Sequence, residues 1–119
     1  MIYTSYFANI KNLPEGFVPV SICGAAPEWW EGLQYKKVAP KKWFFQRWKQ
    51  NHDNDFYVRN FKAEVLDRLE AAQVVSELKE LSGSEDIILL CYETPKQFCH
   101  RHLVAAWLNE NGFECKEWD

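Results

Sequence analysis

The sequence has 119 residues, 47% of them hydrophobic and 16% aromatic, which is enough for one folded domain with a buried core but not for two. This composition excludes an intrinsically disordered chain. The formal net charge of −3 at pH 7 excludes a surface coated with positive charge, of the kind that binds nucleic acid non-specifically.

The N-terminal residues do not resemble an export signal. The stretch MIYTSYFANI lacks a basic flank and a long apolar run, and no segment approaches the roughly 18 apolar residues that cross a bilayer. The four cysteines form no C-x-x-C pair, so free thiols are expected rather than disulfides. We therefore expect a cytoplasmic protein without a membrane partner.

Two strands and a long loop are predicted first along the chain. Residues 2–7 (IYTSYF) are β-branched and aromatic and predict a strand, and residues 17–23 (FVPVSIC) predict a second strand. Because Pro19 cannot donate a hydrogen bond, this second strand should be an edge strand or an irregular one. Residues 24–40 contain two prolines and two glycines without a period, which predicts a loop packed down by its own tryptophans.

Helices are predicted in the middle of the chain. Pro40 suits the first position of a helix, where its missing N–H costs nothing. Such a helix would turn Trp43, Phe44 and Trp48 inward. Residues 57–81 follow helical spacing, but their apolar stripe slips once, which predicts a kink or two consecutive helices.

The last third of the chain completes an α/β pattern. Residues 87–93 are apolar on both faces until their end, as expected of a strand with helices on both sides. A helix is predicted over residues 98–111, ending at Gly112, and residues 113–118 predict a last short strand. We expect one layered α/β domain over residues 1–119, with a mostly parallel central sheet of about four to five strands flanked by helices.

Reactive side chains gather where this strand is followed by the last helix. Strand alternation places Glu93 at the carboxyl end of the strand, the edge at which open parallel sheets usually bind ligands. At about 100° per residue, His100 falls within the apolar stripe of the helix, with Cys99 and Arg101 at its margins. By the same spacing, His102 points to solvent.

These positions predict a pocket for a phosphate or carboxylate group. The first turn of a helix offers unpaired N–H groups and the positive end of the helix dipole, and an arginine lies close by. We assign candidate catalytic roles to Glu93 and His100. The candidate substrate-binding residues are Arg101, Cys99, Cys91 and Tyr92.

A structural interpretation stays open for each of these residues. Cys99 and His100 diverge by about 100° on a helix and do not easily form a catalytic couple, so a packed thiol and a histidine bonded to the backbone or to Glu93 explain them as well. Glu93 and Arg101 also fit a simple ion pair. A metal site would need Cys91, Cys99, His100 and His102, a spacing that matches no familiar zinc pattern, so no metal and no cofactor is expected.

Residues 36–49 hold six basic residues and no acidic one, interleaved with aromatic residues. One interpretation is a surface that contacts phosphates and stacks on the bases of a nucleic acid. The other is an amphipathic helix with buried aromatic residues and solvated lysines, which the spacing favours. The nucleic-acid candidates are Lys41, Lys42, Trp43 and Arg47.

The segments LLCYE and CHRHLVAAWL, joined by a short spacer, resemble the family called domain of unknown function 488. Its members look like small α/β domains with a C-x-E and then a C-H-R signature. The resemblance extends to IYTSYF, SICGAAP, VAP and YVRNFKAEVL, and so covers nearly the whole chain. The chain is most similar to a divergent subgroup in which Phe98 precedes the C-H-R motif and His102 follows it. The residues that correspond to the signature are Cys91, Glu93, Cys99, His100 and Arg101.

One departure from the family pattern bears on the site. Many members carry an acidic and a basic residue in the segment after the second strand, where this chain reads SICGAAP. If those groups belong to a family site, this chain lacks them or supplies them from elsewhere.

These observations lead to three alternative functions. The first is an enzyme or ligand-binding domain for an anionic substrate, with a nucleotide or a nucleic acid as the candidate class and the pocket at the carboxyl edge of the sheet. The second is a non-enzymatic module that binds nucleic acid or protein through residues 36–49. The third is a polar cluster that only stabilises the fold.

Overall fold

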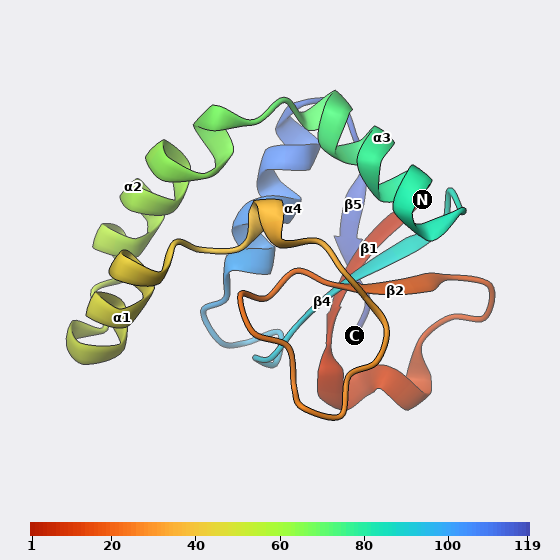
Figure 1. Ribbon diagram of the computed structural model, residues 1–119, viewed down its shortest axis with the longest axis horizontal. Coiled ribbons are helices and arrows are strands. Elements are labelled where there is room, and N and C mark those ends of the chain that lie inside the picture. The colour runs from red at the N-terminus through yellow and green to blue at the C-terminus, as the bar shows by residue number, and fades with distance from the viewer.

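A five-stranded sheet forms the centre of the computed structural model, which describes residues 1–119 (Figure 1). All strand pairs are parallel, in the order β3-β2-β4-β1-β5. The predicted α/β fold with a mostly parallel sheet is therefore confirmed. The strands are β1 (Ile2–Tyr6), β2 (Val18–Ser21), β3 (Leu33–Gln34), β4 (Ile87–Cys91) and β5 (Cys115–Glu117).

Four α-helices and three short 3-10 helices connect these strands. The predicted break within residues 57–81 is confirmed, because α2 ends at Glu64 and a 3-10 turn separates it from α3. No helix has the length and apolar composition needed to span a membrane. The helices are α1 (Lys42–Asn51), α2 (Asn54–Glu64), α3 (Ala71–Ser82) and α4 (His100–Glu110), and the 3-10 helices are η1 (Phe7–Asn12), η2 (Lys36–Val38) and η3 (Leu66–Arg68).

All four α-helices contribute their buried residues to one face of the sheet, whereas η1 and the loop after β2 cover the other face (Figure 1). Parallel crossovers are right-handed, so connections that run in opposite directions across a sheet lie on opposite faces. The β3–β4 and β4–β5 connections run one way and carry the α-helices, and the β1–β2 connection runs the other way. The expectation that residues 87–93 have helices on both sides is met by α-helices on one face and by the 3-10 helix η1, with a loop, on the other.

Strand β4 is buried on both faces and anchors the fold. Ile87 and Leu89 pack into the larger core cluster beneath the helices, while Ile88 and Leu90 pack into the smaller cluster that contains Phe7. Burial of each such side chain contributes about 1.5–3 kcal/mol. A strand between two apolar layers needs this continuous apolar run, although only one of the layers here is built of α-helices.

The second strand is not at the edge of the sheet. The two-residue strand β3, which the sequence does not predict, pairs beyond it with Val20 and Ser21. Pro19 pairs with Ile88 of β4 but has no partner in β3. A residue without an N–H is tolerated there because the ladder is open on that side.

Helix α1 begins at Lys42, two residues later than Pro40. Phe44 is fully buried and Trp48 partly buried, as predicted, because residues four positions apart share one helix face. Trp43 is 48% exposed, so the expectation that it points inward is wrong. It lies about 100° around the helix from Phe44, and its ring packs at the edge of Phe56 on the outer side of α1.

Candidate functional site

A cavity of about 640 Å³ opens at the carboxyl ends of β2 and β4. Its floor is formed by Cys23 after β2, Cys91 at the end of β4, and Cys99 and His100 at the start of α4. Glu93 lies beside them, in the loop that follows β4. The strand-end rule thus places the cavity correctly at this edge of the sheet.

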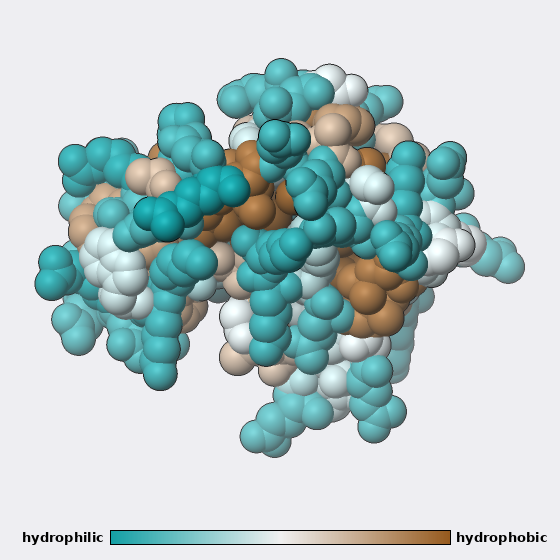
Figure 2. All heavy atoms as spheres, turned by 45° about the horizontal axis from the view of Figure 1, so that its top comes forward, coloured by the Kyte–Doolittle hydropathy of each residue, from teal (hydrophilic) through white to brown (hydrophobic).

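One wall of the cavity is aromatic and basic and comes mainly from α1. Phe45 and Trp48 line it, and Trp48 packs against Phe98 with 5.5 Å between ring centroids. Lys42 and Lys49 stand on the same wall. Figure 2 shows that polar side chains cover most of one molecular face, with apolar ones visible between them in hollows.

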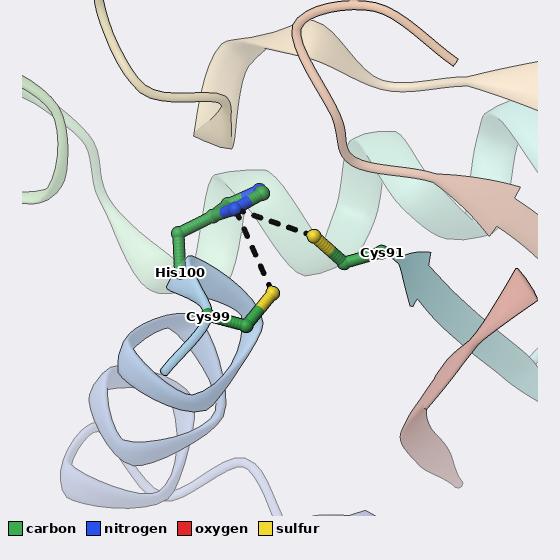
Figure 3. A group of neighbouring side chains, drawn as sticks. All are labelled: Cys91, Cys99 and His100. Carbon is green, nitrogen blue, oxygen red and sulfur yellow. Dashed lines mark hydrogen bonds between the residues drawn. The ribbon is translucent and has the colours of Figure 1, made fainter. Parts of the chain in front are cut away.

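His100 is buried and turned inward, as its position in the apolar stripe predicts (Figure 3). Its Nε2 donates a hydrogen bond to the Ile22 carbonyl oxygen, with 2.8 Å between the two atoms. The other ring nitrogen, Nδ1, lies 3.5 Å from the Cys91 Sγ and 4.0 Å from the Cys99 Sγ. The hydrogen bond to the backbone is what the structural interpretation of His100 predicts. The Nδ1 atom has no backbone partner and faces two thiols.

The thiols of the floor are close together and buried. All four cysteines of the chain are free, as predicted. The Cys91 Sγ lies 3.6 Å from the Cys23 Sγ and 3.6 Å from the Glu93 Oε2. Hydrogen bonding to Cys23 and burial raise the pKa of the Cys91 thiol, and hydrogen bonding to Cys91 and burial raise the pKa of the Cys99 thiol. Without a bound cation, neither is poised as a thiolate nucleophile at neutral pH.

Arg101 does not line the cavity. Its guanidinium is fully buried, forms an ion pair with the Glu117 carboxylate at 2.8 Å, and donates to the backbone carbonyl of Glu93. The alternative of an ion pair between Glu93 and Arg101 is therefore wrong. Burial disfavours the charged guanidinium, but Glu117 outweighs this effect and raises the pKa of Arg101. The structure thus corrects the expectation that Arg101 anchors an anion in the pocket, because Glu117 already occupies its donors.

His102 is also placed differently from the expectation. It is half-buried rather than solvated, and its Nε2 is buried without a hydrogen-bond partner. Burial, together with the positive charge of Arg101, lowers the pKa of His102. The ring lies away from the three side chains that meet at the cavity floor, so it does not belong to that cluster.

The remaining predicted residues divide between the cavity and the outer surface. Tyr92 lines the cavity, and its hydroxyl donates to the Ala25 carbonyl at 2.6 Å. Of the nucleic-acid candidates, Lys42 lines the cavity and Lys41 does not. Trp43 and Arg47 lie against the Phe56 ring, outside the cavity.

Several cavity residues were missed by sequence reasoning. Cys23 follows β2 and could have been found by the same strand-end rule that identifies Glu93, because parallel strands end at one edge. Most of the others face the cavity because α1 and α2 fold back over the strand ends, a long-range contact without a local signal, whereas Phe98 belongs to the loop before α4. They are Phe45, Trp48, Lys49, Tyr57 and Phe98.

Comparison with known proteins agrees with the resemblance drawn from the signature. The family model described as "Active DUF488-N3 subclade" matches residues 12–112. No curated protein and no solved structure matches the chain. The matched segment contains every residue of the cavity, from Cys23 to His100, and most of the sheet. The chain therefore belongs to the DUF488 family, in its N3 subclade.

Proposed function

We propose that this protein is an enzyme that binds a nucleotide in the cavity and acts on it with Glu93 as the acid–base group. The observation that carries the proposal is the composition of the cavity. Unpaired lysines and aromatic rings form one wall, and a carboxylate and an imidazole are among the other lining residues. A volume of about 640 Å³ suits a mononucleotide, since small-molecule pockets measure about 300–1,000 Å³.

Lys42 and Lys49 would contact the phosphates. They are seven positions apart on α1, which places them on the same side of the helix two turns apart. Both are exposed at the cavity, and neither forms an ion pair with an acidic residue. Their charges are therefore free to pair with an anion, a role that Arg101 cannot fill.

The aromatic wall would bind the base. Phe45, Trp48 and Phe98 line the cavity, and base stacking on such rings contributes about 1–3 kcal/mol per base. A ligand with an aromatic ring at one end and a phosphate at the other matches this wall better than a simple sugar phosphate does.

Glu93 is the acid–base candidate because its carboxylate lies on the cavity and is partly exposed. His100 is the second candidate, and only its Nδ1 is free of a backbone partner. The description of the matched family model as an active subclade supports an enzyme over a passive binding domain.

The test is a thermal-shift and calorimetric screen of nucleoside mono- and diphosphates, with sugar phosphates and short oligonucleotides as comparison ligands. A nucleotide at a hundred times its dissociation constant stabilises the folded protein by about 2.7 kcal/mol. The double variant Lys42→Glu/Lys49→Glu should lose this stabilisation. The matched control, Lys41→Glu/Arg47→Glu, changes the net charge equally on the outer side and should keep it.

Turnover is then measured by incubating the stabilising nucleotide with the protein and separating the products by chromatography. Glu93→Gln should lower the rate by about 100-fold or more while binding changes less than about tenfold. Stabilisation by oligonucleotides alone would favour a nucleic-acid substrate. The proposal would be refuted if no nucleotide stabilised the protein. It would also be refuted if the control double variant lost as much of the stabilisation as Lys42→Glu/Lys49→Glu.

A further inference from the structure

Three potential metal ligands converge at the floor of the cavity. Cys91 approaches from the end of β4, and Cys99 and His100 from the start of α4, with both thiols and the imidazole pointing toward one another (Figure 3). The three donor atoms, the two Sγ and the His100 Nδ1, all lie within 4.8 Å of one another. The three ligands thus come from the two ends of the loop that connects β4 to α4.

The separations are close to those of a tetrahedral zinc site. Bond lengths of about 2.3 Å for sulfur and about 2.0–2.1 Å for nitrogen imply sulfur–nitrogen separations of about 3.6 Å. The observed separations from Nδ1 are 3.5 Å to Cys91 and 4.0 Å to Cys99. The two sulfur–nitrogen separations are therefore within about 0.4 Å of the tetrahedral value, and the two sulfur atoms lie within 4.8 Å of each other.

The hydrogen bond to Ile22 prepares the imidazole for this role. Because a carbonyl oxygen can only accept, the Nε2 must carry the proton, and in neutral imidazole the Nδ1 then presents a lone pair. Metal-binding histidines almost always donate their second N–H to a carbonyl or a carboxylate in this way. The atom with the free lone pair is the one that faces the two thiols.

We propose that Cys91, Cys99 and His100 bind one zinc ion, with the fourth coordination position open to the cavity. Two thiolates and a neutral imidazole would bind Zn²⁺ with no net charge, which suits a buried floor. Hard cations such as Mg²⁺ and Ca²⁺ prefer oxygen ligands and do not fit this donor set. All three residues line the cavity, so a water molecule or a ligand atom can reach the fourth position.

The zinc site goes beyond the proposed function and does not depend on it. Three protein ligands and an open position are typical of catalytic zinc, which lowers the pKa of a bound water to about 7. The Glu93 Oε2 lies 3.6 Å from the Sγ of the ligand Cys91, and the Glu93 carboxylate would be the acid–base group for such a water. With the His100 Nδ1 bound to zinc, Glu93 is the acid–base group of the cavity.

The experiment measures the metal directly, without any nucleotide. The full chain is purified under reducing conditions, and its zinc content is determined by elemental analysis after dialysis. The metal is then removed, and the reduced protein is titrated with Co²⁺, which gives thiolate-to-metal charge-transfer absorption and intense visible bands when it is tetrahedral. We expect one equivalent of zinc and one equivalent of cobalt with this spectrum.

Variants then assign the ligands. Cys91→Ala, Cys99→Ala and His100→Ala should each lose the cobalt spectrum at equimolar metal, while the buried but distant Cys115→Ala and the neighbouring His102→Gln should keep it. Cys23→Ala tests whether Cys23 is a fourth ligand. This variant should also keep the cobalt spectrum, since Cys23 contacts only Cys91 among the three ligands.

Folding of each variant is checked by circular dichroism, and the titration of the unmodified protein decides the question if a variant fails to fold. No stoichiometric zinc together with no tetrahedral cobalt spectrum in the unmodified protein would overturn the proposal. A spectrum that survives in Cys91→Ala would also overturn it. Nucleotide binding without metal would leave the proposed function standing and remove only the zinc site.

Discussion

The Nε2 of His100 and the carbonyl oxygen of Ile22 are 2.8 Å apart, and their hydrogen bond ties the start of α4 to the chain just beyond β2. Both residues are buried. The hydrogen bond joins residues 78 positions apart in the sequence and fixes the ring of His100, which lines the cavity.

We expect His100→Ala to destabilise the metal-free protein by about 2 kcal/mol, because the buried Ile22 carbonyl would lose its partner. Urea unfolding in the presence of a chelator measures this change. The control is His52→Asn, at an exposed position whose left-handed backbone conformation Asn tolerates. A loss for His100→Ala no larger than for the control would show that water replaces the ring as the partner.

The buried ion pair between Arg101 and Glu117 should matter more than an exposed pair next to it in sequence. Glu117→Gln leaves a buried guanidinium without its counter-charge, and we expect a loss of about 2–4 kcal/mol. Glu114→Gln removes the partner of the exposed Lys116 and should cost less than about 0.5 kcal/mol. Both variants remove one negative charge from the same terminal segment, so their denaturant midpoints are directly comparable. Equal midpoints would contradict the structural role of Arg101.

His102 should lower the free energy of unfolding as the pH falls. Its pKa is lowered in the folded state, mainly by burial, whereas in the unfolded chain it is about 6.5. Above that value both states are neutral and stability is unaffected. As the pH falls from about 6.5 to the folded pKa, the unfolded state takes up a proton first, so stability is lost. Urea midpoints between pH 7.5 and pH 5 measure the slope, and His102→Gln should reduce it. An unchanged slope in the variant would assign it to other groups.

Trp48 should determine ligand affinity, and Trp43 should not. Both belong to α1, but Trp48 lines the cavity and Trp43 packs on the outer side. Trp48→Ala should weaken binding of the stabilising nucleotide by about tenfold or more, the equivalent of one stacking contact. Trp43→Ala should change it less than about twofold. Isothermal calorimetry on the two folded variants makes the comparison, and similar losses would place the base outside the aromatic wall.

Much of the fold could be predicted because it is encoded in local sequence patterns. The apolar run of β4 and the slip between α2 and α3 are visible in the sequence and are present in the structure. Strand β3 could not be predicted, since it has two residues and is held by pairing with β2 and by a hydrogen bond from the Tyr35 N–H to the Ser21 carbonyl. The single-sided helical layer follows from strand order, which local patterns do not reveal.

The site could be predicted in part for the same reason. Helical spacing correctly turned His100 inward, and the strand-end rule correctly placed Glu93 at the cavity. The nearest thiol to the imidazole is that of Cys91, on another element, and not that of its sequence neighbour Cys99. Arg101 was misplaced because Glu117, its partner, belongs to the last strand. Both of these errors concern a contact between different elements of the fold.

The two sides of the cavity come from separate stretches of the chain. Strand ends and the start of α4 supply the reactive floor, whereas the long segment between β3 and β4 supplies the aromatic wall apart from Phe98. If the protein acts as proposed, substitutions on the cavity side of α1 can change which ligand binds while Glu93 and His100 keep their positions. This makes α1 the natural place to begin if the selectivity of the protein is to be redesigned.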